Sequence, residues 1–314
     1  MIRYLFWGRP GIRCNRFHRV APAVCTVDDI HHWRDGGGQW TEAVFLTRKA
    51  IFFDIDGTLI NIMQQRPQMT ERTRQAIESL RRAGHRTLIA SGRPFVYLDD
   101  ELTTQGLFDG YVLMNGAAVF VDGRCVYEQS LPRALVQEIV ALSEEHGVEY
   151  ILQGPRQVYL RPEFHGLESF YRGIGIDTGR FVRSFSLENI AVCKMEFLSF
   201  EAEGGGVFRR LLAMPGLTGL MDPYHKKNME LYASDISKGS GILRALDALS
   251  IPVNDSIAFG DGLNDIEMMQ TVGTGVAMGN ARPEVKAAAR YTVPSVDEDG
   301  VAWGISHLIL HCDD

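Results

Sequence analysis

The sequence has few cysteines and no long uncharged apolar stretch. One of its longest uncharged segments spans residues 110–121, well short of the roughly 18 residues that a membrane-spanning helix needs. The five cysteines are scattered and form no CxxC pair, which argues against a zinc site or a redox dithiol. We therefore expect a protein of the reducing cytoplasm, without a membrane partner.

Basic residues are also scarce outside the first segment of the chain. The net charge is −7, and residues 1–48 hold seven arginines against four acidic residues, so the remainder carries −10. A chain this acidic is a poor candidate for binding nucleic acid through a broad basic face. We expect no nucleic-acid partner, and any anionic ligand must be held by local positive charge.

Residues 1–48 lack the apolar periodicity of the rest of the chain, and no acidic residue precedes Asp28. An Arg-rich, acid-poor start is typical of transit peptides, but their serines and their amphipathic pattern are missing. We interpret this segment as an N-terminal extension that is disordered or not part of the domain. A targeting segment and a start-site artefact are the alternatives.

From Lys49 onward, short apolar runs alternate with amphipathic stretches. This alternation predicts an α/β fold in which helices cover a doubly wound, mainly parallel, Rossmann-like sheet. The strands are expected at residues 49–54, 86–90, 111–114, 256–260 and 273–277, and the helices from Thr70, from Ser237 and over residues 263–270. The second of these helices is expected to bury one face made of Ile242, Leu243, Leu246 and Leu249.

The middle of the chain has a different rhythm. A hairpin-like strand, an amphipathic helix and a further strand are expected at residues 124–129, 131–146 and 192–199. The sequence therefore predicts a core of residues 49–122 and 225–314, interrupted by an inserted α+β module of residues 123–224.

Two acidic residues, Asp54 and Asp56, directly follow the first buried strand. In an open α/β sheet, ligands bind at the carboxyl ends of the strands. Two carboxylates about 4 Å apart repel by roughly 4 kcal/mol at an effective dielectric of 20, and such hard oxygen ligands suit Mg²⁺. An EF-hand is excluded, because Leu59 and Gln65 stand where its loop needs Gly and Glu. The alternative is an exposed acidic turn.

Similar groups of residues follow other strands. Asp261 and Asp265 lie after the strand at residues 256–260, where they either share a metal ion or cap a helix. Ser91 and Gly92 follow the second strand and combine a hydroxyl group with a backbone that a phosphate can approach closely. Lys238 is expected in the first turn of a helix, where the helix dipole disfavours a cation. That position hints at a functional role, although a lysine there is, on its own, usually a solvated side chain.

Together these segments resemble the four motifs of the haloacid-dehalogenase (HAD) phosphatases, and within them the Cof-type hydrolases of subfamily IIB, which carry a large α+β cap. The motifs are Asp54-Ile55-Asp56-Gly57-Thr58-Leu59, Ser91-Gly92-Arg93, Ile236-Ser237-Lys238-Gly239 and Gly260-Asp261-Gly262-Leu263-Asn264-Asp265. The resemblance covers residues 49–310, and no motif residue departs from the family pattern.

The resemblance implies a role for each motif residue. Asp54 is the nucleophile and Asp56 the general acid and base. Asp54, the backbone carbonyl of Asp56, and Asp261 hold Mg²⁺, while Asp265 and Thr58 support these ligands without binding the metal. The groups that hold the phosphoryl oxygens are Ser91, the amides of Ile55 and Gly92, Lys238 and Asn264.

The implied function is that of a magnesium-dependent phosphomonoester hydrolase. It acts through an aspartyl-phosphate on small phosphorylated metabolites, such as sugar or cofactor phosphates, as a monomer or weak homodimer. A phosphomutase or other phosphotransferase, and a non-catalytic sugar-phosphate sensor, are the alternatives. Specificity is expected in the cap, where the candidate contacts are His146, His165, Arg172 and Arg183, although each also fits an ordinary surface position.

Overall fold

The computed structural model describes residues 33–34, 40–41, 47–64, 66–222 and 225–311. The chain divides into two units, Met1–Leu46 and Thr47–Asp314. Within the first unit, β1 (Trp33–Arg34) pairs antiparallel with β2 (Trp40–Thr41). The remainder of that unit, which makes up most of the expected N-terminal extension of residues 1–48, lies outside the described residues.

The larger of the two sheets in the second unit has, among the described residues, the strand order β15-β14-β13-β3-β4-β5-β6-β7. Its strands are β3 (Ala50–Phe53), β4 (Arg86–Ala90), β5 (Gly110–Leu113), β6 (Ala118–Val121), β7 (Arg124–Glu128), β13 (Ser256–Gly260), β14 (Thr274–Ala277) and β15 (Tyr291–Thr292). The pairs from β15 to β5 are parallel, whereas β6 and β7 continue the sheet antiparallel. The predicted α/β fold with a mainly parallel sheet is confirmed.

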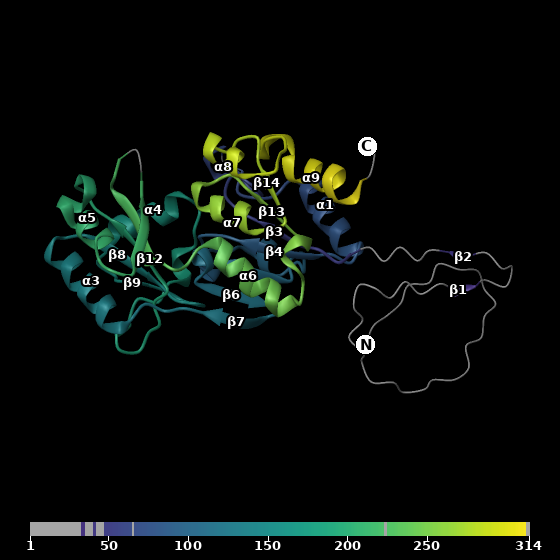
Figure 1. Cartoon of the computed structure of the whole chain (residues 1–314). Helices are drawn as coiled ribbons and strands as arrows, with labels where there is room; N and C mark the ends of the chain where they lie inside the picture. Colours follow the sequence, from purple (N-terminus) through teal and green to yellow (C-terminus); the bar gives the residue numbers. More distant parts are fainter. Residues whose placement is uncertain (1–32, 35–39, 42–46, 65, 223–224, 312–314) are drawn as a thin grey trace, which may run out of the picture. The chain divides into compact units, whose positions relative to one another are not determined.

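Alternating side chains of β3 enter two hydrophobic cores, one on each face of this sheet. Phe52 packs in the core that contains Ile242, and Phe53 in the core that contains Ile77. The helices of this part of the chain are α1 (Glu71–Arg82), α2 (Asp100–Thr103), α6 (Lys238–Leu249), α7 (Ile266–Thr271), α8 (Pro283–Ala288) and α9 (Gly300–Gly304). In Figure 1, α1 lies beside α9 and α6 beside α7. Across the described ranges, no helix has both the length and the apolar character to cross a membrane.

Helix α6 begins at a Ser237 capping box, in which the Ser237 and Ser240 side chains each bond the other's backbone. Ile242 and Leu246 are buried as predicted, but Leu243 is 46% exposed. The prediction for Leu243 is wrong because the buried face of the helix continues through Ala245 instead, and position 243 lies one residue, about 100°, away from Ile242 around the helix. The capping box places Lys238 at the first residue of α6.

A second sheet is antiparallel and has the order β11-β12-β10-β8-β9. Its strands are β8 (Glu149–Gln153), β9 (Val158–Leu160), β10 (Lys194–Leu198), β11 (Leu217–Met221) and β12 (Asn228–Ala233), and its helices are α3 (Arg133–Glu145), α4 (His165–Gly173) and α5 (Val207–Leu212). We call this sheet with its helices the cap (Figure 1). β7 belongs to the larger sheet and β12 to the cap sheet. The cap therefore begins after residue 123 and ends after residue 224, the two bounds expected for the insertion.

Candidate active site

The carboxyl ends of β3 and β13 bring the two acidic motifs together. These strands are parallel neighbours with Phe53 opposite Phe259, and the Asp54 amide donates to the Phe259 carbonyl at 2.9 Å. A cavity of about 690 Å³ opens there. The predicted site residues that line it are Asp54, Asp56, Ser91, Gly92, Asp261 and Asn264.

Lys238 forms a buried ion pair with each of two aspartates. Its Nζ donates to Asp54 Oδ1 and to Asp265 Oδ1, both at 2.6 Å, although only 1% of the residue is exposed. Burial alone lowers the pKa of Lys238, but the charges of Asp265 and Asp54 outweigh it and raise that pKa. Burial raises the pKa of Asp54 well above its ordinary value, while Lys238 opposes this shift. Lys238 is therefore a fixed cation among the carboxylates.

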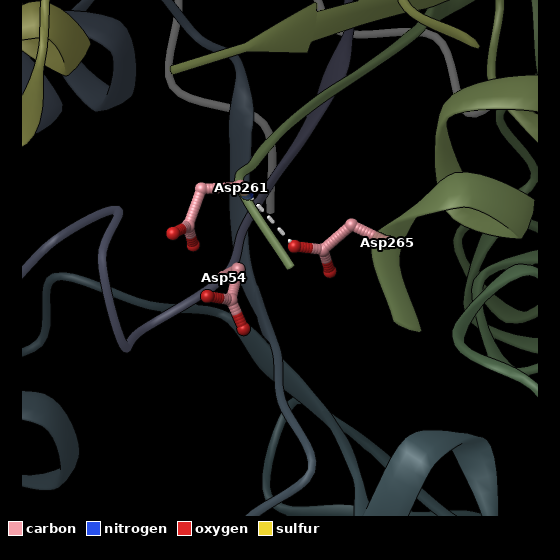
Figure 2. Close-up of side chains that lie close together, drawn as sticks. All are labelled: Asp54, Asp261 and Asp265. Atoms are coloured by element: carbon pink, nitrogen blue, oxygen red, sulfur yellow. Dashed lines mark hydrogen bonds between the residues drawn. The ribbon is translucent and has the colours of Figure 1, made fainter. Parts of the chain in front are cut away.

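Asp265 is fully buried and uses both carboxylate oxygens within the protein. Oδ1 accepts from Lys238, and Oδ2 accepts from the amides of Asp261 and Gly262 at 2.9 Å each. The carboxyl groups of Asp54, Asp261 and Asp265 gather in one region, with one oxygen of each lying within 4.8 Å of the others (Figure 2). Asp265 thus positions the loop that carries Asp261.

The residues present fit a divalent cation. When Asp54, Asp261 and Asp265 are ionised, Lys238 offsets one of their three charges and leaves a net charge of −2. Asp261 Oδ1 is buried and has no hydrogen-bond partner among the described residues, and burial followed by the charge of Asp265 raises the pKa of Asp261 to about 6. An unpartnered buried carboxylate oxygen in an all-oxygen donor set is suited to Mg²⁺.

The turn after β3 approaches Asp261 closely. Gly57 has φ +84°, and a Cβ atom added there would lie 2.3 Å from Asp261 Oδ2. The Asn280 side chain donates to the Gly57 carbonyl at 2.8 Å and to Asp261 Oδ2 at 3.1 Å. Glycine is required at position 57 both by its backbone conformation and by the space that Asp261 occupies.

Asp56 faces the cavity and forms a two-point hydrogen bond with an arginine that carried no predicted role. Its carboxylate accepts from Arg93 Nε at 2.8 Å and from Arg93 Nη2 at 2.6 Å. Burial lowers the pKa of Arg93, but the hydrogen bond and the charge of Asp56 outweigh it and raise that pKa. The position of Arg93, directly after Ser91 and Gly92, could have indicated from the sequence that it lies in the site. The pair fixes the orientation of the Asp56 carboxylate.

The predicted phosphate-binding groups lie around the same strand ends. Asn264 Nδ2 donates to Asn115 Oδ1 at 3.1 Å, and the Arg93 amide donates to Ser91 Oγ at 3.2 Å. A Cβ atom on Gly92 would lie 3.1 Å from Asn115 Oδ1, so this backbone is closely packed. Asn115 itself is held at φ 56°. No role was predicted for Asn115 from the sequence.

Ile55 and Thr58 form the turn beneath these groups. The Ile55 carbonyl accepts from the Leu59 amide at 2.9 Å and the Ile60 amide at 3.0 Å. Thr58 is buried, and its Oγ1 has no hydrogen-bond partner within the described part of the chain. The roles expected for the Ile55 amide and for Thr58 stay predictions.

The cap residues that line the cavity differ from the four expected ones. The cavity is lined by Phe170, Tyr171, Ile174, Ile176, Lys194, Glu196 and Glu230. The expected contacts His146, His165, Arg172 and Arg183 are not among its lining residues in the described structure. Arg172 and Arg183 instead pair with Glu168. Charged residues at alternate positions of the strand Lys194–Leu198 were the overlooked signal.

The fold and the strand-end acids agree with comparisons to known proteins. The chain belongs to the haloacid dehalogenase-like hydrolase family, whose sequence model matches residues 51–305. YkrA of Bacillus subtilis is 31% identical over 275 residues, which cover 83% of this chain and 98% of the relative. YitU of the same organism, a 5-amino-6-(5-phospho-D-ribitylamino)uracil phosphatase, is 30% identical, and the match covers 80% of this chain and 94% of YitU.

A solved structure extends this comparison. The HAD subclass IIB sugar phosphatase BT4131 is 31% identical, with a TM-score of 0.71 and coverage of 83% of this chain and 98% of that one. The predicted family and the predicted enzyme class, a phosphatase, are confirmed by these matches.

Proposed function

We propose that the protein is a magnesium-dependent phosphomonoesterase that forms an aspartyl-phosphate on Asp54 and acts on small phosphorylated metabolites. The observation that carries this proposal is the buried set in which Lys238 Nζ lies 2.6 Å from both Asp54 and Asp265, beside the unpartnered oxygen of Asp261. The phosphatase activity named for YitU and for BT4131 supports a substrate of this class.

The first step is attack by an Asp54 carboxylate oxygen on the phosphorus atom. The new oxygen–phosphorus bond forms as the ester bond breaks, and the leaving oxygen takes a proton from Asp56. Lys238 and the side chains of Ser91 and Asn264 offer donors to the phosphoryl oxygens as charge develops on them. Asp54, Asp261 and the Asp56 carbonyl would hold magnesium, which would supply charge that offsets repulsion between the carboxylates and the phosphate.

In the second step Asp56 removes a proton from water, whose oxygen then attacks the phosphorus atom of the phosphoaspartate. The acyl phosphate bond breaks, inorganic phosphate leaves and the Asp54 carboxylate is restored. Arg93 orients Asp56 for both proton transfers: its fork bonds both oxygens of the carboxylate, and the unprotonated oxygen still accepts from Arg93 when the other carries the proton. This role of Asp56 contributes typically about 10²–10⁴-fold to the rate.

Replacement of the nucleophile tests the proposal. Asp54→Asn is nearly isosteric and removes the attacking charge, so turnover of p-nitrophenyl phosphate should fall by more than about 10³-fold while the protein stays folded. Asp247→Asn, an exposed change on α6, serves as the matched control. Mass spectrometry after rapid quenching should find a phosphorylated Asp54 only in chains that keep this aspartate. Turnover by Asp54→Asn within tenfold of the parent would contradict the proposal.

Chelation tests the metal requirement. Two acidic strand ends without a cation repel each other and the incoming phosphate, so EDTA should abolish phosphate release and added Mg²⁺ should restore it. Calorimetry should detect Mg²⁺ binding to the parent and a loss of that binding in Asp261→Asn. Full turnover by metal-free protein would refute this part of the mechanism. The same assay of phosphate release separates a phosphatase from a phosphomutase, because a phosphomutase would transfer the phosphoryl group to a sugar instead of releasing it.

A further inference from the structure

Two cap carboxylates face each other on the wall of the cavity. Glu196 of β10 and Glu230 of β12 are directly opposite in the strand register, and both line the cavity. Their side chains are 23% and 20% exposed. Like charges directly opposite on neighbouring strands destabilise a sheet unless other groups offset them, so the partners of this pair show what it can bind.

Lys194 bridges the two carboxylates and is only 2% exposed. Its Nζ donates to Glu196 Oε1 at 2.9 Å, to Glu230 Oε2, and to the Gly92 carbonyl at 3.0 Å. An ammonium group has three donors, and all three are used. Lys194 therefore has no donor left for an anionic ligand, and the three charged groups together keep a net charge of −1.

The two glutamates, which line the cavity, keep acceptor capacity. Glu196 also accepts from Gln153 Nε2 at 2.8 Å and from the Tyr171 hydroxyl, and Glu230 from Asn115 Nδ2 at 3.3 Å. A carboxylate offers about four acceptor sites, so three protein donors leave one on Glu196, and two leave two on Glu230. These sites can accept only from hydroxyl, amine or similar donor groups.

The contact between Lys194 and Gly92 places this cluster beside the phosphate-binding loop. A substrate whose phosphoryl group lies at Asp54 and Ser91 would therefore extend its leaving group along Glu196 and Glu230. Phe170, Ile174 and Ile176 line the same cavity and supply apolar surface.

We infer that Glu196 and Glu230 select the substrate by charge: they accept hydrogen bonds from hydroxyl or amine groups of the leaving group and reject a second phosphate or a carboxylate there. This inference rests on the proposed phosphatase function. It assigns specificity to a negatively charged cap wall, so the preferred substrates carry one phosphate and an uncharged or cationic, donor-rich leaving group.

Two probes that differ only at carbon 1 test the inference: glucitol 6-phosphate carries a hydroxymethyl group there and 6-phosphogluconate a carboxylate. The parent should prefer glucitol 6-phosphate in kcat/KM by about tenfold or more, because juxtaposed like charges disfavour binding. Glu196→Gln and Glu230→Gln should each reduce this preference at least threefold. Glu188→Gln, the same change on the exposed cap surface, should keep the parental ratio.

The outcomes separate the inference from the proposed function. Parental hydrolysis of p-nitrophenyl phosphate with equal kcat/KM for the two probes would overturn the inference and leave the function intact, as would a preference unchanged in both glutamine variants. Should the parent hydrolyse no ester, the proposed function fails. Calorimetric binding of both probes to Asp54→Asn then decides the inference, with equal affinities overturning it and tighter binding of glucitol 6-phosphate supporting it.

Discussion

At the scale of single residues, the fork between Arg93 and Asp56 leads to a prediction about leaving groups. Arg93→Lys keeps the positive charge but loses the two-point geometry that orients the carboxylate. We expect turnover of an alkyl phosphate to fall about tenfold or more and that of p-nitrophenyl phosphate to fall less, because a good leaving group needs little protonation. Steady-state kinetics with both esters measures the difference.

The control for this change is Arg82→Lys, a conservative replacement on the exposed surface of α1. It should alter neither rate. Equal slowing of the alkyl and aryl esters by Arg93→Lys would show that Arg93 acts on something other than the proton transfer of Asp56.

Lys238 provides a second prediction, concerning stability. Lys238→Met leaves Asp54 and Asp265 buried without their shared cation, and breaking a buried pair in this way costs about 3–5 kcal/mol of unfolding free energy. Burial raises the pKa of Asp54 above its ordinary value of 3.8. At a pH above 3.8 the cost of burying the ionised carboxylate therefore destabilises the fold, and this destabilisation is relieved as the pH falls through the raised pKa. The deficit relative to the parent should therefore shrink towards pH 5.

Chemical denaturation in EDTA at pH 8 and at pH 5 measures this deficit. Lys226→Met is the control, because the Lys226 side chain is 52% exposed in its pair with Glu203, and exposed pairs contribute little. A deficit for Lys238→Met that is small at pH 8, or that grows as the pH falls, would contradict the assigned electrostatics.

Sequence alone predicted which motif residues meet but not how they are paired. Asp54 and Asp261 were expected together because parallel strand ends share one edge of a sheet. The saturation of Asp265 by Lys238 and two amides depends on side-chain rotamers and loop geometry, which no spacing rule supplies. The same holds for the cap, where Lys194 and Glu196 become neighbours of Glu230 only through strand register.

At the scale of elements, the turn after β3 is tightly constrained by its contact with Asp261. Gly57→Ala should cost roughly 1–2 kcal/mol through its left-handed backbone and should also displace the Asp261 carboxylate. We expect Mg²⁺ affinity to fall at least tenfold, measured by calorimetry. Gly84→Ala is the matched control: Gly84 has φ +88° but open space around its Cβ position. Equal Mg²⁺ affinity in the two variants would refute the close approach.

Element positions were largely predictable, because β4 and β13 match the expected ranges of residues 86–90 and 256–260. Strongly apolar runs bounded by polar turns specify such buried strands. The sheet that a strand joins was harder to predict. The sequence of β7 is typical of a hairpin strand, and it would look the same in either sheet. Its pairing with β6 depends on tertiary contacts that the local sequence does not encode.

At the scale of the whole molecule, the site uses two sheets with different tasks. In the proposed mechanism the larger sheet supplies the reacting groups at the ends of its parallel strands, and the cap sheet supplies Lys194, Glu196 and Glu230 to the same cavity. Chemistry and selection can therefore change independently, because substitutions on the cap strands leave the strand ends of the larger sheet in place.

The division of the chain at Leu46 and Thr47 leads to the last prediction. The family match begins at residue 51, and YkrA is covered over 98% of its own length by its match to this chain. A chain that starts at Thr47 behind an added Met should therefore keep its turnover and keep its Tm within about 3 °C, a shift of under ~1 kcal/mol for a domain of this size. Calorimetry and p-nitrophenyl phosphate hydrolysis compare it with the full chain. A second truncation that starts at Phe53 removes most of β3 and should fail to fold, which confirms that the assay detects loss of the core. Insolubility or a large loss of activity in the chain starting at Thr47 would show that the first 46 residues are required by the catalytic unit.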